Sequence, residues 1–149
     1  MNIAEYLPAE AVLADLKARN SDEVLAELAA PLLNLHPELE QFDLMRVLHE
    51  REELGSTAVG EGVAIPHGKV PGLHKPALAV GRSNLGIDFA APDKGLCHLF
   101  FLILVPESGA GQHLRLLAQL ARRVKDPVFR SELLLAENSE QLRHVLTAP

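Results

Sequence analysis

The sequence predicts an α/β domain whose mixed parallel and antiparallel β-sheet of about five strands carries helices on both faces. Short apolar, β-branched runs alternate along the chain with longer segments whose apolar residues recur at helical spacing. The strongest run, residues 96–105, is almost continuously apolar, as expected of a central strand covered on both faces. The runs between residues 63 and 89 have the spacing of hairpins, which favours antiparallel pairs there and therefore a mixed sheet.

Length and composition bound the kind of protein. The 149 residues fit one domain, residues 1–149, and 48% hydrophobic with 23% charged residues is the pattern of a soluble globular chain. The longest apolar stretch, residues 99–105, is far shorter than the roughly 20 residues of a membrane span. The first residues lack the features of a signal peptide, and the single cysteine, Cys97, cannot form an internal disulfide. We therefore expect a cytoplasmic protein that does not insert into a membrane.

Charge is distributed unevenly along the chain. Residues 1–62 hold 13 acidic and 4 basic residues, whereas residues 63–149 hold 7 acidic and 10 basic residues. Nucleic-acid binding needs a concentrated basic footprint, so we expect no nucleic-acid partner. The basic second half leaves room for a local anion site, but two differently solvated surfaces explain the imbalance equally well.

The predicted strands are short apolar runs bounded by proline, glycine or polar residues. They cover residues 11–16, 63–65, 77–81, 87–89 and 96–105.

The first predicted helix begins at a cap formed by Asn20 or Ser21, and its apolar stripe continues to Leu35. Pro31 lies inside this stripe, and proline should kink or end the helix there. Four further helices are expected to begin near Pro37, near Gln112, at Pro127 and at Ser139.

A glycine-rich segment, residues 55–70, contains the most conspicuous histidine of the chain, His67. Residues 63–65 read as the end of a buried strand that stops at Pro66, and Gly68 is expected to turn the chain away directly after the histidine. A rigid strand end of this kind can hold a reactive side chain in a fixed position. A structural histidine in a tight turn is an equally good interpretation of the local pattern.

Two further residues are candidates for an anion site. His113 stands in the first turn of a predicted helix, where free backbone N–H groups and the helix dipole attract anions. A polar residue that caps or covers the helix start is an equally good interpretation. Arg51 lies in the last turn of the second helix. Arginine there interacts favourably with the helix dipole, and for this residue taken alone the structural interpretation is the better one.

The seven histidines invite a metal-binding interpretation, but they show no close ligand spacing and no paired cysteines. We therefore expect no metal and no cofactor. His98 is most simply a histidine of the core or of a strand edge. His36, His49 and His144 are most simply solvated helix positions.

Taken together, these segments resemble a known family. Leu48-His-Glu-Arg-Glu-Glu-Leu-Gly-Ser-Thr-Ala-Val-Gly-Glu-Gly-Val-Ala-Ile-Pro-His-Gly-Lys69 is similar to the signature of phosphotransferase-system IIA proteins of the fructose/mannitol type, and Gly111-Gln-His113-Leu-Arg-Leu-Leu-Ala resembles their second-histidine region. The resemblance implies that His67 is the phosphorylated histidine, His113 the second active-site histidine and Arg51 the active-site arginine. The length and opening segment look most like the nitrogen-type branch, whose members regulate rather than carry sugar.

The resemblance also implies a reaction and partners. The chain would accept a phosphoryl group from a small phosphorylated histidine phosphocarrier protein and regulate target proteins according to its phosphorylation state. One alternative within the family is a sugar-transport IIA component that passes phosphate to a membrane permease. Alternatives from other classes are a non-enzymatic regulator that binds partners around His67, and a metal-dependent hydrolase that uses several histidines.

Overall fold

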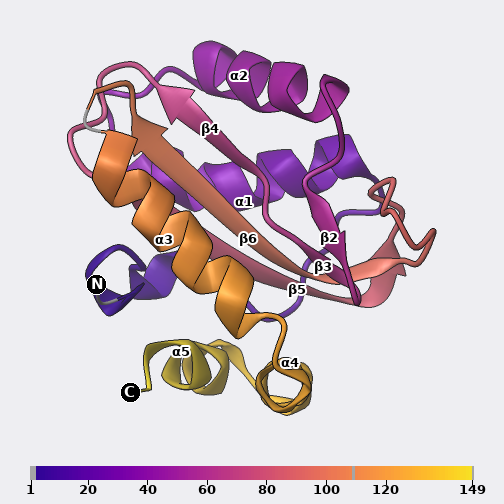
Figure 1. Cartoon of the computed structure of the whole chain (residues 1–149). Coiled ribbons are helices and arrows are strands. Elements are labelled where there is room, and N and C mark those ends of the chain that lie inside the picture. Colours follow the sequence, from indigo (N-terminus) through magenta and orange to yellow (C-terminus); the bar gives the residue numbers. More distant parts are fainter. Residues whose placement is uncertain (1–2, 109, 149) are drawn as a thin grey trace.

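A computed structural model describes residues 3–108 and 110–148, and within them the side chains of all residues except Ala110, Gln112 and His113. The chain folds into a mixed six-stranded sheet with helices on both faces (Figure 1). The strands are β1 (Val12–Leu13), β2 (Ala58–Gly60), β3 (Val63–Ala64), β4 (His67–Val70), β5 (Ala77–Ile87) and β6 (Cys97–Pro106). The helices are α1 (Ser21–Leu35), α2 (Gln41–Glu53), α3 (Ala110–Arg123), α4 (Pro127–Leu135) and α5 (Ser139–Thr147), preceded by 3₁₀ turns at Ile3–Glu5 and Ala9–Ala11.

Strand β6 is the centre of the sheet. Its antiparallel neighbour is β5, and along its other edge lie β3 and then β4, both parallel to it. Val63 of β3 pairs with Leu99, and His67 of β4 pairs with Ile103, so a single edge of β6 holds two consecutive short strands. Strands β1 and β2 complete the sheet at its two ends, in the order β1-β5-β6-β3-β2.

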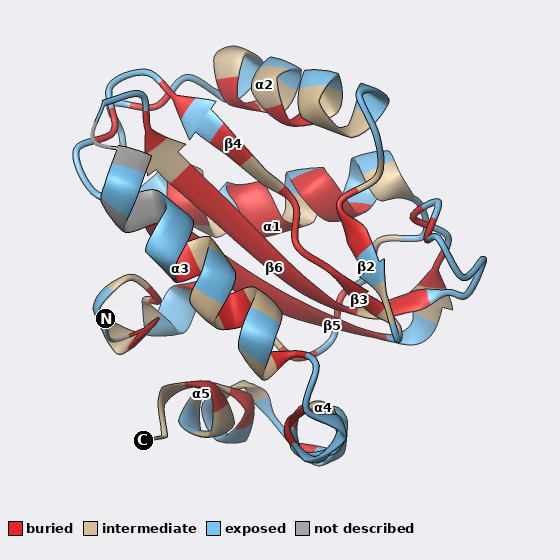
Figure 2. Ribbon diagram, in the orientation of Figure 1, coloured by how far each residue is buried: buried red, intermediate tan, exposed pale blue. Residues whose placement is uncertain are grey.

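Alternate residues of β6 enter two separate hydrophobic cores. Figure 2 shows that the strand is buried along most of its length. Phe100, Leu102 and Leu104 pack beneath α1 and α2, whereas residues 99, 101 and 103 pack beneath α3, α4 and α5. All six of these side chains are at most 1% exposed. This arrangement confirms the prediction that residues 96–105 form a central strand covered on both faces.

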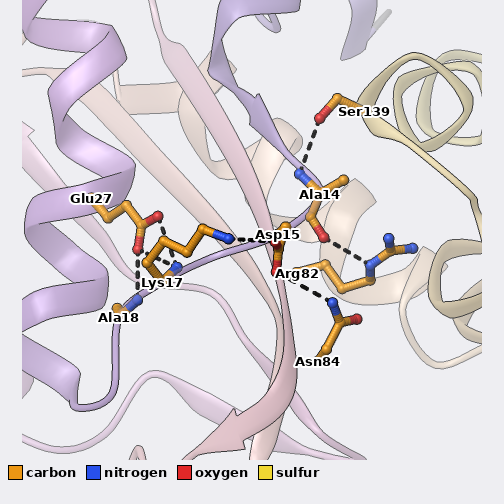
Figure 3. Close-up of polar contacts among 8 residues, drawn as sticks. All are labelled: Ala14, Asp15, Lys17, Ala18, Glu27, Arg82, Asn84 and Ser139. Carbon is orange, nitrogen blue, oxygen red and sulfur yellow. Dashed lines mark hydrogen bonds and ion pairs between the residues drawn. The ribbon is translucent and has the colours of Figure 1, made fainter.

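Buried Arg82 of β5 ties the C-terminal helices to the sheet. Its Nε donates a hydrogen bond to Ala14 O at 3.0 Å, and its Nη1 donates to Leu133 O at 2.9 Å and to Ala136 O at 2.5 Å (Figure 3 shows the contact with Ala14). The hydroxyl of Ser139 accepts a hydrogen bond from Ala14 N at 3.1 Å. The guanidinium thereby satisfies carbonyl groups at the end of α4, where the helix has no further N–H donors and the dipole favours a cation.

The mixed sheet and all five helices are confirmed, but the predicted strands differ in detail. The expected strands at 77–81 and 87–89 are one strand, β5, with an irregularity in its pairing between Arg82 and Ile87. The prediction that the strands between residues 63 and 89 pair with one another is wrong, because β3, β4 and β5 each pair with β6. Residues 58–60 form a strand, β2, that was not predicted. Strand β1 has two residues instead of six.

Helix α1 continues through Pro31 to Leu35, so an end at Pro31 is wrong. The proline removes one N–H donor from the helix, but Leu28, Ala29 and Leu32 on either side of it are fully buried. Their packing against the sheet outweighs one missing hydrogen bond. The predicted cap at Asn20 is confirmed, because its side chain accepts a hydrogen bond from Glu23 N at 2.8 Å. None of the described helices is both long and apolar enough to span a bilayer.

Candidate functional site

His67 is the first residue of β4, and its position is set by the crossing from β3 to β4. β3 ends at Ala64, which confirms the predicted stop before Pro66. The carbonyl of Pro66 accepts a hydrogen bond from Ile103 N at 2.9 Å, which holds this crossing against β6. The turn expected at Gly68 is wrong, because the chain continues as a strand to Val70 and pairs residue by residue with β6.

Gly68 has a different role from the one predicted. A Cβ atom at this position would lie 2.7 Å from Val47 Cγ1 of α2, closer than side-chain carbon atoms approach one another. The glycine therefore lets α2 lie directly against β4, and Figure 1 shows this helix alongside the strand. Arg51, one turn further along α2, is brought toward His67 by the same close packing.

The imidazole ring of His67 is half-buried and held in one orientation. Its Nδ1 lies 2.8 Å from the carbonyl oxygen of Ile65. A carbonyl oxygen only accepts hydrogen bonds, so Nδ1 must be the protonated donor. In the neutral ring, Nε2 consequently carries the lone pair and is the nucleophilic nitrogen.

His67 and Arg51 line the same pocket, which has a volume of about 910 Å³ and lies at the edge of the sheet between α2 and α3. Residues of α2 and its end, of β4 and β6, and of α3 form its wall: Val47, Glu50, Arg51, Glu53, Leu54, His67, Gly68, Lys69, Ile103, Val105, Leu114 and Leu117. The structure thus brings together two of the three residues predicted for the site.

Arg51 both contacts the chain just past the end of α2 and faces the pocket. Its Nη1 donates a hydrogen bond to the carbonyl of Gly55 at 2.9 Å, just past the end of α2. The same side chain is only partly buried and faces the pocket of His67. The rest of the guanidinium is available to an anion bound there.

The segment after Arg51 is fixed by a neighbouring carboxylate. Glu52 accepts a hydrogen bond from Thr57 N at 3.0 Å, and its other oxygen accepts one from the Thr57 hydroxyl. Thr57 is buried, so this pair anchors the short connection between α2 and β2. The anchor holds the end of α2, and with it Arg51, in a fixed position relative to the sheet.

His113 lies in the first turn of α3, as predicted, but its side chain is outside the described part of the structure. Leu114 and Leu117 of the same helix line the pocket of His67. The start of α3 therefore borders the pocket, while the position of the His113 imidazole stays a prediction.

Several residues of the pocket were not predicted from the sequence: Lys69, Glu50, Glu53 and the exposed apolar residues. Leu54 is 86% exposed and Leu114 is 66% exposed, although both line this concave surface. Lys69 was missed because a turn was expected at Gly68. In a strand, residues 67 and 69 lie on the same face, and this period of two was the signal available.

The other histidines whose side chains the structure describes lie outside this pocket. His98 of β6 directs Nδ1 to the carbonyl of Ser83 at 2.8 Å, which agrees with a structural role at the sheet. Within the described residues, no three His, Cys, Asp or Glu side chains are grouped so that they could hold a metal ion. A second concave surface, of about 1120 Å³, lies along α4 and α5 and contains none of the predicted site residues.

Comparison with known proteins shows the family of the chain. Residues 5–148 match the family model of the phosphoenolpyruvate-dependent sugar phosphotransferase system, EIIA 2. A nitrogen regulatory protein of Bradyrhizobium diazoefficiens is 38% identical over 149 residues, which are all of this chain and 97% of the relative. A fructose-specific EIIA component of the phosphotransferase system from Haloferax volcanii is 42% identical over 99 residues, 66% of this chain and 64% of the relative.

A solved structure agrees with these sequence similarities. The crystal structure of the nitrogen regulatory protein IIA-Ntr from Neisseria meningitidis matches with a TM-score of 0.91 and 34% identity, over 97% of this chain and 99% of that one. Proteins of the matched family transfer phosphoryl groups. The resemblance seen in the sequence is confirmed: this chain belongs to the EIIA type 2 family of the phosphotransferase system and is similar over its whole length to nitrogen regulatory members.

Proposed function

We propose that this chain accepts a phosphoryl group on Nε2 of His67 from a phosphorylated histidine phosphocarrier protein, and that its phosphorylation state controls the binding of target proteins. The observation that carries the proposal is the bond from His67 Nδ1 to the Ile65 carbonyl, inside a pocket that also holds Arg51. This bond fixes the ring and leaves one nitrogen free to act as a nucleophile.

The proposed step is a transfer between two nitrogen atoms. The Nε2 lone pair attacks phosphorus while the bond from phosphorus to the donor histidine breaks, and the donor ring recovers its lone pair. Positive charge develops on the His67 ring as the new bond forms, and the Ile65 carbonyl that accepts from Nδ1 stabilises it. The donor and acceptor rings exchange one phosphoryl group, and no redox change is involved.

Phosphoryl transfer depends mainly on position and on stabilisation of charge on the equatorial oxygens. Arg51 would supply a guanidinium at the pocket wall, and its Nη1 bond to Gly55 O restricts the motion of the side chain. The resemblance gives His113 a matching role from the first turn of α3, where backbone N–H groups also favour an anion. No metal ion or cofactor is needed for this scheme.

The shape of the pocket suits a protein partner. Its rim carries the exposed apolar side chains of Leu54 and Leu114, and desolvated apolar contacts of this kind anchor protein interfaces. A phosphoryl group on His67 adds a charge of about −1.5 to −2 at the centre of this apolar rim. A target protein that packs on the rim would therefore distinguish the two forms of the chain.

The proposal is tested by incubating the protein with phosphoenolpyruvate and the general phosphotransferase components, followed by mass spectrometry of intact protein and peptides. We expect one acid-labile phosphoryl group on His67. His67→Gln should abolish the adduct, whereas His49→Gln, at a histidine of α2 outside the pocket, should leave it unchanged. Labelling of His67→Gln at the wild-type rate would refute the proposal. Binding of targets with equal affinity to both forms would remove the regulatory part.

A sugar-transport role is a second candidate, because the Haloferax volcanii relative is a fructose-specific EIIA component. The two roles share the chemistry at His67 and differ in the acceptor. A gene for a sugar permease beside the gene of this chain, and rapid transfer of the label to the IIB domain of that permease, would favour transport. A cytoplasmic location also stays a prediction, which fractionation of cells would test.

A further inference from the structure

Lys69 shares one face of β4 with His67. Burial alternates along the strand: Gly68 and Val70 are buried, whereas Lys69 is exposed and His67 is half-buried. Lys69 pairs with Val105 as His67 pairs with Ile103, and all four residues line the same pocket. The alternation of strand side chains thus places a lysine beside the histidine on the wall of the site.

The ammonium group of Lys69 is not paired with another described side chain. Its ammonium group makes no hydrogen bond or ion pair with any other described residue. By contrast, Arg51 uses one nitrogen to hold the Gly55 carbonyl, and Glu50 is paired with Arg46 at 3.4 Å. Arg51 and Lys69 are the two cationic side chains that the structure describes on the pocket wall. Of these two, Lys69 is therefore the one whose position is free to adapt to a ligand.

The spacing of the two residues fits a shared ligand. Alternate residues of a strand are separated by about 6.7 Å along its axis. The flexible four-carbon stem of a lysine spans much of that separation, and a phosphoryl group on His67 Nε2 extends from the ring into the same pocket. The ammonium group would then meet the phosphoryl oxygens without any movement of the backbone.

We propose that Lys69 is a phosphate-binding residue of this site, whose ammonium group pairs with the phosphoryl group carried by His67. The inference rests on the function proposed above and deepens it. Lys69 stabilises the doubly charged form of the phosphoryl group, while Arg51 and His67 are positioned by the fold. A lysine that merely protects the edge of a sheet from pairing with other chains has no such effect.

The test uses phosphoramidate as a chemical donor, so that no partner protein is required. Its P–N bond breaks, ammonia leaves, and the phosphoryl group becomes bonded to Nε2. The ionisation of the phosphoryl group is then followed by ³¹P NMR as a function of pH. The samples are wild type, Lys69→Met, Lys69→Arg and Lys75→Met, the last removing an exposed lysine outside the pocket.

A nearby cation favours the dianion, so Lys69→Met should raise the midpoint of this titration by about half a pH unit, a threefold change in the ionisation constant. Lys69→Arg and Lys75→Met should titrate like wild type, and about 1 M salt should reduce the effect of Lys69→Met.

Two results would overturn the inference. If Lys69→Met is phosphorylated on His67 and titrates like wild type, Lys69 does not bind the phosphoryl group and the proposed function stands. If Lys75→Met shifts the midpoint as much as Lys69→Met does, the effect is one of net charge and not of the site. Failure of wild type to take a phosphoryl group from either phosphoramidate or a carrier would instead refute the proposed function, and this inference with it.

Discussion

Val47 of α2 occupies the space that a side chain at position 68 would need, because a Cβ on Gly68 would lie 2.7 Å from Val47 Cγ1. The contact joins the helix that carries Arg51 to the strand that carries His67. The separation of these two residues across the pocket therefore depends on the absence of a side chain between them.

Gly68→Ala should push α2 away from β4. We expect a loss of about 1–3 kcal/mol in the free energy of unfolding, the usual cost of inserting a methyl group into a packed site. The rate of phosphorylation of His67 should fall as well, because Arg51 moves with the helix. Both effects are measured on one preparation, by urea denaturation and by labelling.

Val47→Ala supplies the control for this change. The double variant Gly68→Ala/Val47→Ala restores space at the contact. Its loss in the free energy of unfolding should therefore be smaller than the sum of the losses of the two single variants. If the two losses simply add, contact with Val47 is not the reason why position 68 needs a glycine.

The sequence predicted the frame of this site better than its local geometry. The apolar run of β6 and the helical stripes identify the sheet and its covering helices, because burial on two faces leaves a strong pattern. Gly68 was assigned to a turn because glycine is a common turn residue, whereas here it is required by a contact with residue 47, distant in sequence. A contact of this kind cannot be predicted from the pattern of residues within one segment.

The same reason explains the error at Pro31 and the omission of Lys69. Proline is unfavourable inside a helix locally, but tertiary packing of Leu28 and Leu32 decides the outcome for α1. Lys69 lies beside His67 only because both residues belong to the same strand. That strand was not predicted, because a turn was expected at Gly68. Arg51 and His67 could be named from the sequence, although their meeting in one pocket required the fold.

Replacement of Arg82 should strongly destabilise the protein. Arg82→Met keeps the length of the side chain but leaves the carbonyls of Ala14, Leu133 and Ala136 without their donor in a buried place. We expect a loss of about 2–4 kcal/mol in the free energy of unfolding. Hydrogen exchange should increase first in α4 and α5, which these bonds attach to the sheet.

Arg122→Met is the matched control, because this arginine is exposed near the end of α3. Its effect should stay within about 0.5 kcal/mol. Equal stability of the Arg82 and Arg122 variants would contradict the role assigned to the buried guanidinium.

Cys97 should be nearly inert in the folded protein. Burial raises the pKa of its thiol from 9.0 to about 11, with nearby Asp93, Asp88 and Glu52 adding to the shift. Since only the thiolate reacts, a thiol reagent at pH 8 should modify the native protein slowly and the unfolded protein at once. Rapid modification of native protein would show that this segment opens locally.

The raised pKa of Cys97 also gives stability a dependence on pH. Below pH 9.0 the thiol is protonated in both states, whereas between 9.0 and about 11 only the unfolded state releases the proton. The contribution of Cys97 to stability is therefore lost as the pH rises through this window. Denaturation of wild type and Cys97→Ala at pH 8 and pH 10 should show a larger decrease for wild type, and parallel decreases would contradict the assignment.

The bond to Ile65 should fix the tautomer of His67. In the neutral ring, ¹⁵N NMR of histidine-labelled protein should show a protonated Nδ1 and a free Nε2, because the Ile65 carbonyl accepts from Nδ1 at 2.8 Å. After phosphorylation, coupling to phosphorus should appear on Nε2. His98 is an internal control, since it makes the same kind of bond to Ser83 O at 2.8 Å but lies outside the pocket. It should show the same tautomer and stay unmodified, whereas coupling of phosphorus to Nδ1 of His67 would mean that the bond to Ile65 does not direct the reaction.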